Sequence, residues 1–341
     1  MLFAALRTLA LGMVTIPSGV HAATPMGHVI TVQDPNATVA FRANPNVARY
    51  MVSRGMAALT GKASDAEAWR TLVSTQDIVG IKVYSVPGPN SGTRYAVVAA
   101  VVEGLLATGI PPKQVIVWDR EALDLRLAGF FQLVDKYGVQ VRPSLQSGFD
   151  ANTYYESSLI GNLVWGDFEF GKRDPGIGRK SFVSKLVSRE ITKLINITPL
   201  LNHNIAGVSG NLYGLASGSV DNFARFESDP ARLAVAVPEI YALPAVGDRV
   251  VLNIVDGLIC QYEGGERGLL HYSVMLNELR FSKDPVALDV LSIQELDRQR
   301  DSAKPPAGKN LELYKNAALL ELGVSDPKKI QVETLKLGNR E

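Results

Sequence analysis

The chain has 341 residues, 35 of them basic and 34 acidic, so its formal net charge is +1. Hydrophobic residues make up 46% of the chain and charged residues 20%, which is typical of a globular protein and excludes a disordered, collagen-like or coiled-coil chain. The near-neutral charge argues against a nucleic-acid partner, because neutralising phosphates needs a basic surplus on one face. The length allows one large α/β domain or two smaller ones.

The first 22 residues have the features of a signal peptide. Arg7 gives a weakly positive start, residues 9–16 are mostly apolar, and the tripeptide VHA satisfies the small-residue rule for cleavage before Ala23. The apolar run is too short to span a bilayer comfortably, and no second membrane segment follows it. The sequence therefore predicts an exported protein, periplasmic or secreted, with no membrane partner after cleavage. The alternative is an uncleaved buried helix.

After the signal peptide, the chain divides by pattern into three segments. Residues 23–76 form an N-terminal extension with two candidate helices, residues 44–60 and 64–73. In the second of these, Ser64 and Glu67 have the spacing of a capping box. Residues 77–300 form an α/β domain, and residues 301–341 form a C-terminal linker, helix (residues 311–322) and strand (residues 329–335).

Within residues 77–300, short apolar runs rich in β-branched residues alternate with helical segments. The predicted strands are residues 77–84, 114–118, 139–142, 181–187, 193–198, 249–255 and 278–282, and the predicted helices are residues 94–108, 124–137, 230–241 and 284–300. This alternation is typical of parallel strands joined by right-handed crossovers. Residues 147–180 are expected to form an irregular or antiparallel excursion. The predicted fold class is α/β, with a mostly parallel, mixed sheet flanked by helices.

Polar residues follow these strands at their C-terminal ends, where open parallel sheets bind ligands. We expect three of them, Lys82, His203 and Asp256, to be catalytic. Lys82 would neutralise negative charge on the substrate, and His203 would transfer a proton. Asp256 would orient the His203 ring or hold a metal ion. The expected substrate-binding residues are Ser91, Thr93, Asp119, Arg120 and Asn204. The candidate ligands for a divalent metal are His203, Asp256 and Asp284, although no HxH or HExxH spacing supports such a site.

Each of these residues also has a structural interpretation. A buried Lys82 would need a carboxylate partner, and Asp119 or Asp284 could supply it. Either aspartate could instead cap the helix that follows it. The glycine-rich loop at residues 88–93 could hold an anion on the helix it opens, or it could be a simple turn.

Cysteine usage limits the chemistry further. The single cysteine, Cys260, cannot form an internal disulfide or supply the thiolates of an iron–sulfur cluster. It follows an apolar run, so we expect a small buried hydrophobic side chain, with a catalytic thiolate near His271 as the alternative. The absence of a GxSxG motif disfavours an ordinary α/β-hydrolase.

Nine segments resemble, in their order along the chain and in their amino-acid sequence, the motifs of the domain-of-unknown-function 362 (DUF362) family. They are VGIKV (79–83), the PGP…S…T loop, AVVAAVVEGLLATGIPP (96–112), VIVWDRE (115–121), HNIAGVSGNLYGL (203–215), VDNFARF (220–226), PEIYALPAV (238–246), LNIVDGL (252–258) and SKDPVALD (282–289). The resemblance implies an α/β fold whose activity has no settled assignment. The matching motif positions are Lys82, Asp119, Arg120, His203, Asn204, Asp256, Asp284 and Asp289.

The resemblance also marks two departures. Some relatives carry ferredoxin-type clusters, and this chain lacks the cysteines for them. Many relatives have a lysine two residues before the histidine of the HN motif, where this chain has Leu201.

We therefore expect an exported α/β enzyme acting on a small anionic or carbonyl-bearing molecule. The alternative is a non-catalytic periplasmic protein that binds a small ligand or a metal. A third possibility is a scaffold, for which a broad exposed apolar patch would be the evidence. The expected partner is a small-molecule ligand, and the sequence does not set the oligomeric state.

Overall fold

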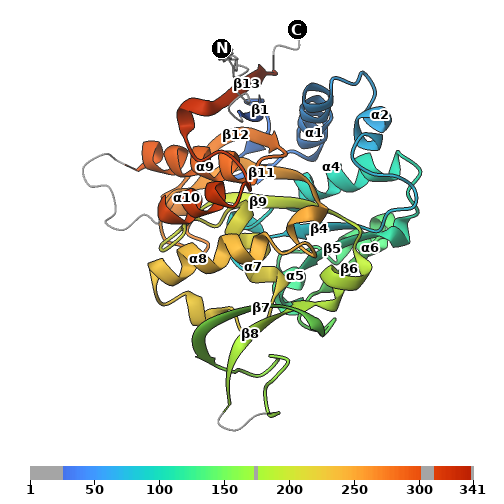
Figure 1. The fold of residues 1–341 in the computed structure, drawn as a ribbon. Coiled ribbons are helices and arrows are strands. Elements are labelled where there is room, and N and C mark those ends of the chain that lie inside the picture. The colour runs from blue at the N-terminus through green and yellow to red at the C-terminus, as the bar shows by residue number, and fades with distance from the viewer. Residues whose placement is uncertain (1–25, 173–175, 301–310, 339–341) are drawn as a thin grey trace, which may run out of the picture.

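The computed structural model describes residues 26–172, 176–300 and 311–338. The predicted signal peptide (residues 1–22) and the predicted linker (residues 301–309) lie outside them. Within the described residues, a nine-stranded sheet has the order β13-β1-β12-β11-β9-β4-β5-β6, and β10 pairs with β9 (Figure 1). Its strands are β1 (Gly27–Gln33), β4 (Val79–Val83), β5 (Val115–Asp119), β6 (Gln140–Pro143), β9 (Lys193–His203), β10 (Gly207–Val208), β11 (Val250–Gln261), β12 (Ser273–Ser282) and β13 (Ile330–Lys336).

Five neighbouring strands form the parallel part of this sheet. β4 lies between β5 and β9 and is parallel to both, β6 continues the order beyond β5, and β11 continues it beyond β9. Every residue of β4 and β5 is buried, as expected for strands covered on both faces. Their carboxyl ends meet at one edge of the sheet, which confirms the predicted α/β class with a mostly parallel, mixed sheet.

Of the three strands beyond β11, β12 runs in the opposite direction, and β1 and β13 return to the direction of the parallel strands. β12 is antiparallel to β11, β1 is antiparallel to β12, and β13 runs parallel to β1. The sequence predicted only residues 278–282 of β12 and placed its C-terminal end beside the ends of the parallel strands. That placement is wrong, because an antiparallel strand ends at the opposite edge of the sheet. Asp284, two residues beyond β12, therefore lies away from the expected site.

Helices cover both faces of the sheet (Figure 1). One core cluster joins it to α1 (Pro45–Thr60), α2 (Asp65–Arg70), α4 (Tyr95–Leu106), α5 (Ala122–Leu127) and α6 (Gln132–Tyr137). The other joins it to α7 (Asn211–Ser219), α8 (Pro230–Tyr241), α9 (Pro285–Gln299) and α10 (Leu311–Leu319). The Ser64 half of the predicted capping box is confirmed, since the Ser64 hydroxyl accepts from the Glu67 backbone at the start of α2. The Glu67 carboxylate accepts from the same hydroxyl and not from the Ser64 backbone N–H that a full capping box would use.

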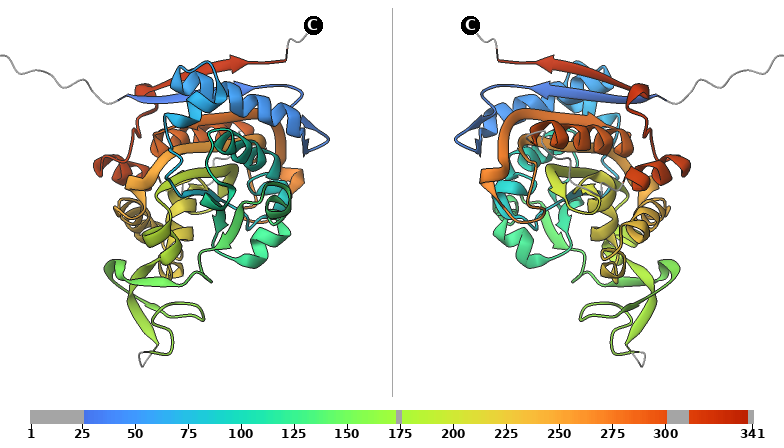
Figure 2. Two further views of the ribbon diagram at one scale, coloured as in Figure 1. Left: turned by 90° about the vertical axis from the view of Figure 1, so that its right-hand side faces the viewer. Right: turned by 90° about the vertical axis from the view of Figure 1, so that its left-hand side faces the viewer.

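The predicted excursion is an antiparallel pair, β7 (Phe149–Asn162) and β8 (Ile177–Ser184). The pair extends away from the body of the molecule (Figure 2). The strand predicted at residues 181–187 is wrong in its second half, where the chain turns into a π-helical segment, Leu186–Glu190.

Two further boundaries differ from the prediction, each for a local reason. The strand predicted at residues 193–198 does not end before Pro199, because β9 continues through this proline to His203. The ladder between β9 and β11 shifts register directly after the Asp256–Pro199 pair, so the sheet tolerates a residue without an N–H there. The helix predicted at residues 124–137 is two helices, α5 and α6, with Gly129 in the left-handed region at φ +84° between them.

Across the part of the chain that the structure describes, no helix combines the length and the apolar character needed to cross a bilayer. The most apolar of them, α4, has 12 residues and packs against the sheet. It is therefore a core helix.

Candidate functional site

A cavity of about 240 Å³ lies at the edge where the parallel strands end. Its walls come from the ends of β4 and β5, from α7, from the short helix Ala224–Phe226 and from the loop after β11. The lining residues are Tyr84, Val86, Asp119, Arg120, Tyr213, Ser217, Gly218, Phe223, Ala224, Glu227 and Glu266. Of the site residues expected from sequence, Asp119 and Arg120 line it.

A buried ion pair forms the floor of this cavity. The Lys82 ammonium lies 2.9 Å from Oδ1 of Asp119, and the two residues are 1% and 4% exposed. The ammonium also donates to the Val83 carbonyl at 2.7 Å. The other carboxylate oxygen, Oδ2, accepts from the backbone and the hydroxyl of Ser85, at 2.7 and 2.6 Å. Of the two interpretations of Lys82, the structure shows the ion pair with Asp119.

The ion pair is closed on one side by α7. A methyl group at Gly218 would overlap Cε of Lys82, so only glycine allows the helix to approach this closely. Lys82 itself does not line the cavity, whereas Asp119 and Gly218, which both lie against its side chain, do. The lysine therefore stabilises the position of Asp119, which does line the cavity.

Arg120 lines the cavity and also fixes the end of α7. Its Nη1 donates to the carbonyls of Ser217 and Val220 at 3.3 and 2.8 Å. These are carbonyls at the C-terminus of the helix, where a cation is favoured by the helix dipole.

Two tyrosine–glutamate pairs form the polar walls. The Tyr84 hydroxyl donates to Glu266, and the Tyr213 hydroxyl donates to Glu227 at 2.8 Å. Burial raises the pKa of Glu266, so this carboxyl keeps its proton to higher pH than an ordinary glutamate. Sequence reasoning missed all four residues. Two of them carried a signal: Tyr84 ends the strand predicted at residues 77–84, and Tyr213 lies in the family-like segment at residues 203–215.

His203 lies behind the cavity wall and not in it. Its ring packs on Tyr213 with centroids 4.2 Å apart. Its Nδ1 accepts from the backbone N–H groups of Ile205 and Ala206, at 3.3 and 2.9 Å, which places the ring proton on Nε2. Burial lowers its pKa to about 4. The neutral ring is thus a hydrogen-bond donor at Nε2, and the expected role as a base lacks a free lone pair.

Asp256 belongs to a separate buried cluster. Its Oδ2 accepts from the Arg94 backbone N–H at 2.9 Å, and its Oδ1 lies 3.0 Å from Nη1 of the same arginine. The carboxylate is fully buried and occupies the N-terminus of α4. The helix end that the sequence suggested for an anionic ligand is therefore filled by Asp256.

The loop at residues 88–93 braces this cluster. The Thr93 hydroxyl accepts from the Tyr84 backbone and donates to the Ile197 carbonyl, which ties the end of β4 to β9. The Ser91 hydroxyl is buried without a hydrogen-bond partner among the described residues. Neither side chain lines the cavity, and Asn204 is an exposed residue that accepts from Asn202 at 3.0 Å.

Two aspartates of the final motif cap helices. Asp284 is the N-cap of α9 and accepts from the Ala287 backbone at 2.8 Å, as its structural interpretation predicted. Asp289 accepts from the backbones of Asn211 and Leu212 at 2.7 and 3.0 Å and so caps α7 from a distant element. Burial raises the pKa of Asp289 to about 7.

The candidate metal ligands are not gathered. Among residues 26–172, 176–300 and 311–338, no group of three or more His, Cys, Asp or Glu side chains could hold a metal ion, so His203, Asp256 and Asp284 do not form a ligand set. Cys260 is fully buried in β11, as expected, and burial raises its pKa to about 12. A buried thiol that stays protonated does not fit the role of an iron–sulfur ligand, which must be a thiolate.

The fold and the cavity define an α/β protein with a small-molecule-sized cavity at the carboxyl edge of a mixed sheet. A family model described as "Domain of unknown function (DUF362)" matches residues 79–294, and the chain belongs to this family. No curated protein matches the chain significantly. A solved structure from Thermotoga maritima, a structural-genomics target, is 9% identical with a TM-score of 0.39, and the match covers 82% of this chain and 60% of that chain.

The ion pair predicts a large stability loss for one conservative change. Asp119→Asn leaves the Lys82 ammonium buried without a counter-charge, and we expect the free energy of unfolding to fall by about 3–5 kcal/mol in urea titrations. The control is Lys82→Met combined with Asp119→Leu, which removes both charges and should recover much of the loss. A loss below about 1 kcal/mol for Asp119→Asn would contradict a buried pair.

His203 predicts a pH dependence. The depressed pKa of His203 means that the unfolded chain binds a proton between about pH 6.5 and 4 that the folded chain does not, so stability falls as the pH drops through this window. His203→Asn keeps an acceptor in place of Nδ1 and does not titrate. The difference in melting temperature between wild type and variant should change across that window. Parallel pH profiles would disprove the assignment.

Proposed function

We propose that this protein binds a small polar molecule in the cavity between Arg120, Glu227 and Glu266. The observation that carries the proposal is the convergence of a guanidinium and two carboxylates from separate segments on one cavity with tyrosine walls. Arg120 suits a carboxylate or carbonyl group, in keeping with the anionic or carbonyl-bearing molecule expected from sequence. The two glutamates suit hydroxyl or amino groups of the same ligand.

The proposal includes catalysis by proton transfer. Lys82, His203 and Asp256 do not line the cavity, so the proton carrier we propose is Glu266, with Tyr84 as its partner. Its raised pKa favours exchange of a proton with a bound substrate nearer neutral pH than an ordinary glutamate allows. The alternative, a non-catalytic binding protein, uses the same cavity, and Glu266→Gln separates them, since it would abolish turnover while binding remains.

A cavity-filling change tests the proposal. Ala224 is an exposed lining residue, so Ala224→Trp should fold normally and occupy the cavity. We expect a panel of sugar acids, amino acids and oxo acids to contain compounds that raise the melting temperature of the wild type but not of this variant. A ligand at a hundred times its Kd stabilises by about 2.7 kcal/mol, which is readily measured.

The matched control is Ala231→Trp, at an exposed position of α8 that does not line the cavity. It should respond to the same compounds as the wild type. Equal responses of both tryptophan variants would place binding elsewhere and refute the proposal.

We also propose that the protein is exported. The support is the charged start, apolar run and small-residue site of residues 1–22. Expression of the full chain in a bacterium with a periplasm should give a mature protein beginning at Ala23, found by intact mass measurement of the periplasmic fraction. An uncleaved chain in the cytoplasm would overturn this proposal.

A further inference from the structure

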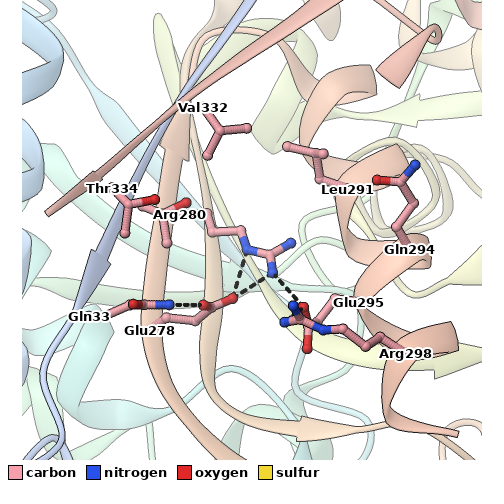
Figure 3. A pocket seen from close by; sticks show the side chains of 10 residues that line it. Gln33, Glu278, Arg280, Leu291, Gln294, Glu295, Arg298, Val332 and Thr334 are labelled. Atoms are coloured by element: carbon pink, nitrogen blue, oxygen red, sulfur yellow. Dashed lines mark hydrogen bonds and ion pairs between the residues drawn. The ribbon is translucent and has the colours of Figure 1, made fainter. Parts of the chain in front are cut away.

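A second cavity, of about 380 Å³, lies beside α9 and shares no lining residue with the candidate site. Its floor is the face of β12, β1 and β13, and its wall is α9 (Figure 3). Two arginines and two glutamates line it, so their formal charges cancel. Their hydrogen bonds decide what the cavity can bind.

The two carboxylates are already occupied. Oε1 of Glu278 accepts from Nε of Arg280 at 2.8 Å and lies 2.5 Å from its Nη2, while Oε2 accepts from Gln33 at 3.0 Å. Oε2 of Glu295 lies 3.5 Å from the same Nη2, and Oε1 accepts from Gln299 at 2.7 Å. Arg298 also pairs with Glu295 from the rim. With these oxygens engaged, the cavity has little left to attract a cation.

One nitrogen of the Arg280 guanidinium has no partner in the part of the protein that the structure describes, and it faces the cavity. Arg280 is 7% exposed, and its Nη1 makes no hydrogen bond or ion pair with any of the described residues. Figure 3 shows this nitrogen pointing away from both carboxylates, toward the side where Gln294 lies. This nitrogen is not among the fully buried polar atoms that lack a partner, and Arg280 lines the cavity, so Nη1 reaches the open space and is free to donate to a bound acceptor.

We propose that this cavity binds a small organic carboxylate, with one carboxylate oxygen accepting from Nη1 of Arg280. The hydroxyls of Thr31 and Thr334 and the amide of Gln294 line the same space and can donate to the ligand. Leu291 and Val332 provide apolar contact for a short carbon chain. The charge-assisted hydrogen bond gives a carboxylate an advantage over an amide of the same shape.

Isothermal titration of the full mature chain tests the inference, with acetate, propanoate and succinate as probes and propanamide as the uncharged control. We expect at least one carboxylate to bind about tenfold or more tightly than propanamide. Val332→Trp fills the cavity from an exposed lining position and should abolish this binding. Gln331→Trp, exposed on the opposite face of the same strand, should leave it unchanged.

Arg280→Gln removes the donor, and its fold is checked by circular dichroism because it lies in a buried network. If this variant unfolds, Val332→Trp and Gln331→Trp still decide the question. The inference is overturned if no probe binds with a Kd below about 10 mM, if propanamide binds as well as propanoate, or if Val332→Trp binds like the wild type. Loss of binding in Ala224→Trp instead would assign the carboxylate to the candidate site and also overturn it.

Discussion

The buried ion pair between Lys82 and Asp119 is the constraint on which the site depends. It places two opposite charges at the carboxyl ends of adjacent strands, where both side chains are almost completely buried. Such a pair tolerates the cost of desolvation only when its remaining hydrogen-bonding groups are satisfied, and here Val83 and Ser85 satisfy them. The turn after β4 is thereby fixed to the end of β5. Asp119, held in this way, forms one side of the cavity.

The helix that packs against this ion pair, α7, is held in position by tertiary contacts. Its nine residues, NLYGLASGS, include two glycines and two serines, which have low helix propensity, and a helix this short is marginal alone. Asp289 holds its N-terminus and Arg120 its C-terminus, each with the charge that the helix dipole favours. The helix carries Tyr213 and Gly218, so the wall and the floor of the cavity are assembled together.

The two cavities differ in how their charges are used. In the candidate site, the carboxylates of Glu227 and Glu266 accept from tyrosine hydroxyls, and these pairs line the open space. Beside α9, the carboxylates are saturated by arginine and glutamine, so that donors remain. Similar residue types therefore present different chemistry, because the internal hydrogen bonds decide which atoms face the ligand. A carboxylate-binding site beside α9 would be separate from the proposed proton-transfer site.

The sequence by itself determined the alternation of strands and helices, the cap at Ser64 and the buried state of Cys260, because these follow from local periodicity, capping and hydrophobicity. It left open whether Lys82 pairs with Asp119 or Asp284, and it placed the end of β12 at the wrong edge. Only the tertiary structure decided these points, since strand direction is set by pairing with β11 and not by the strand's own residues. The Tyr84–Glu266 contact joins residues 182 positions apart, a separation at which no local pattern specifies a partner.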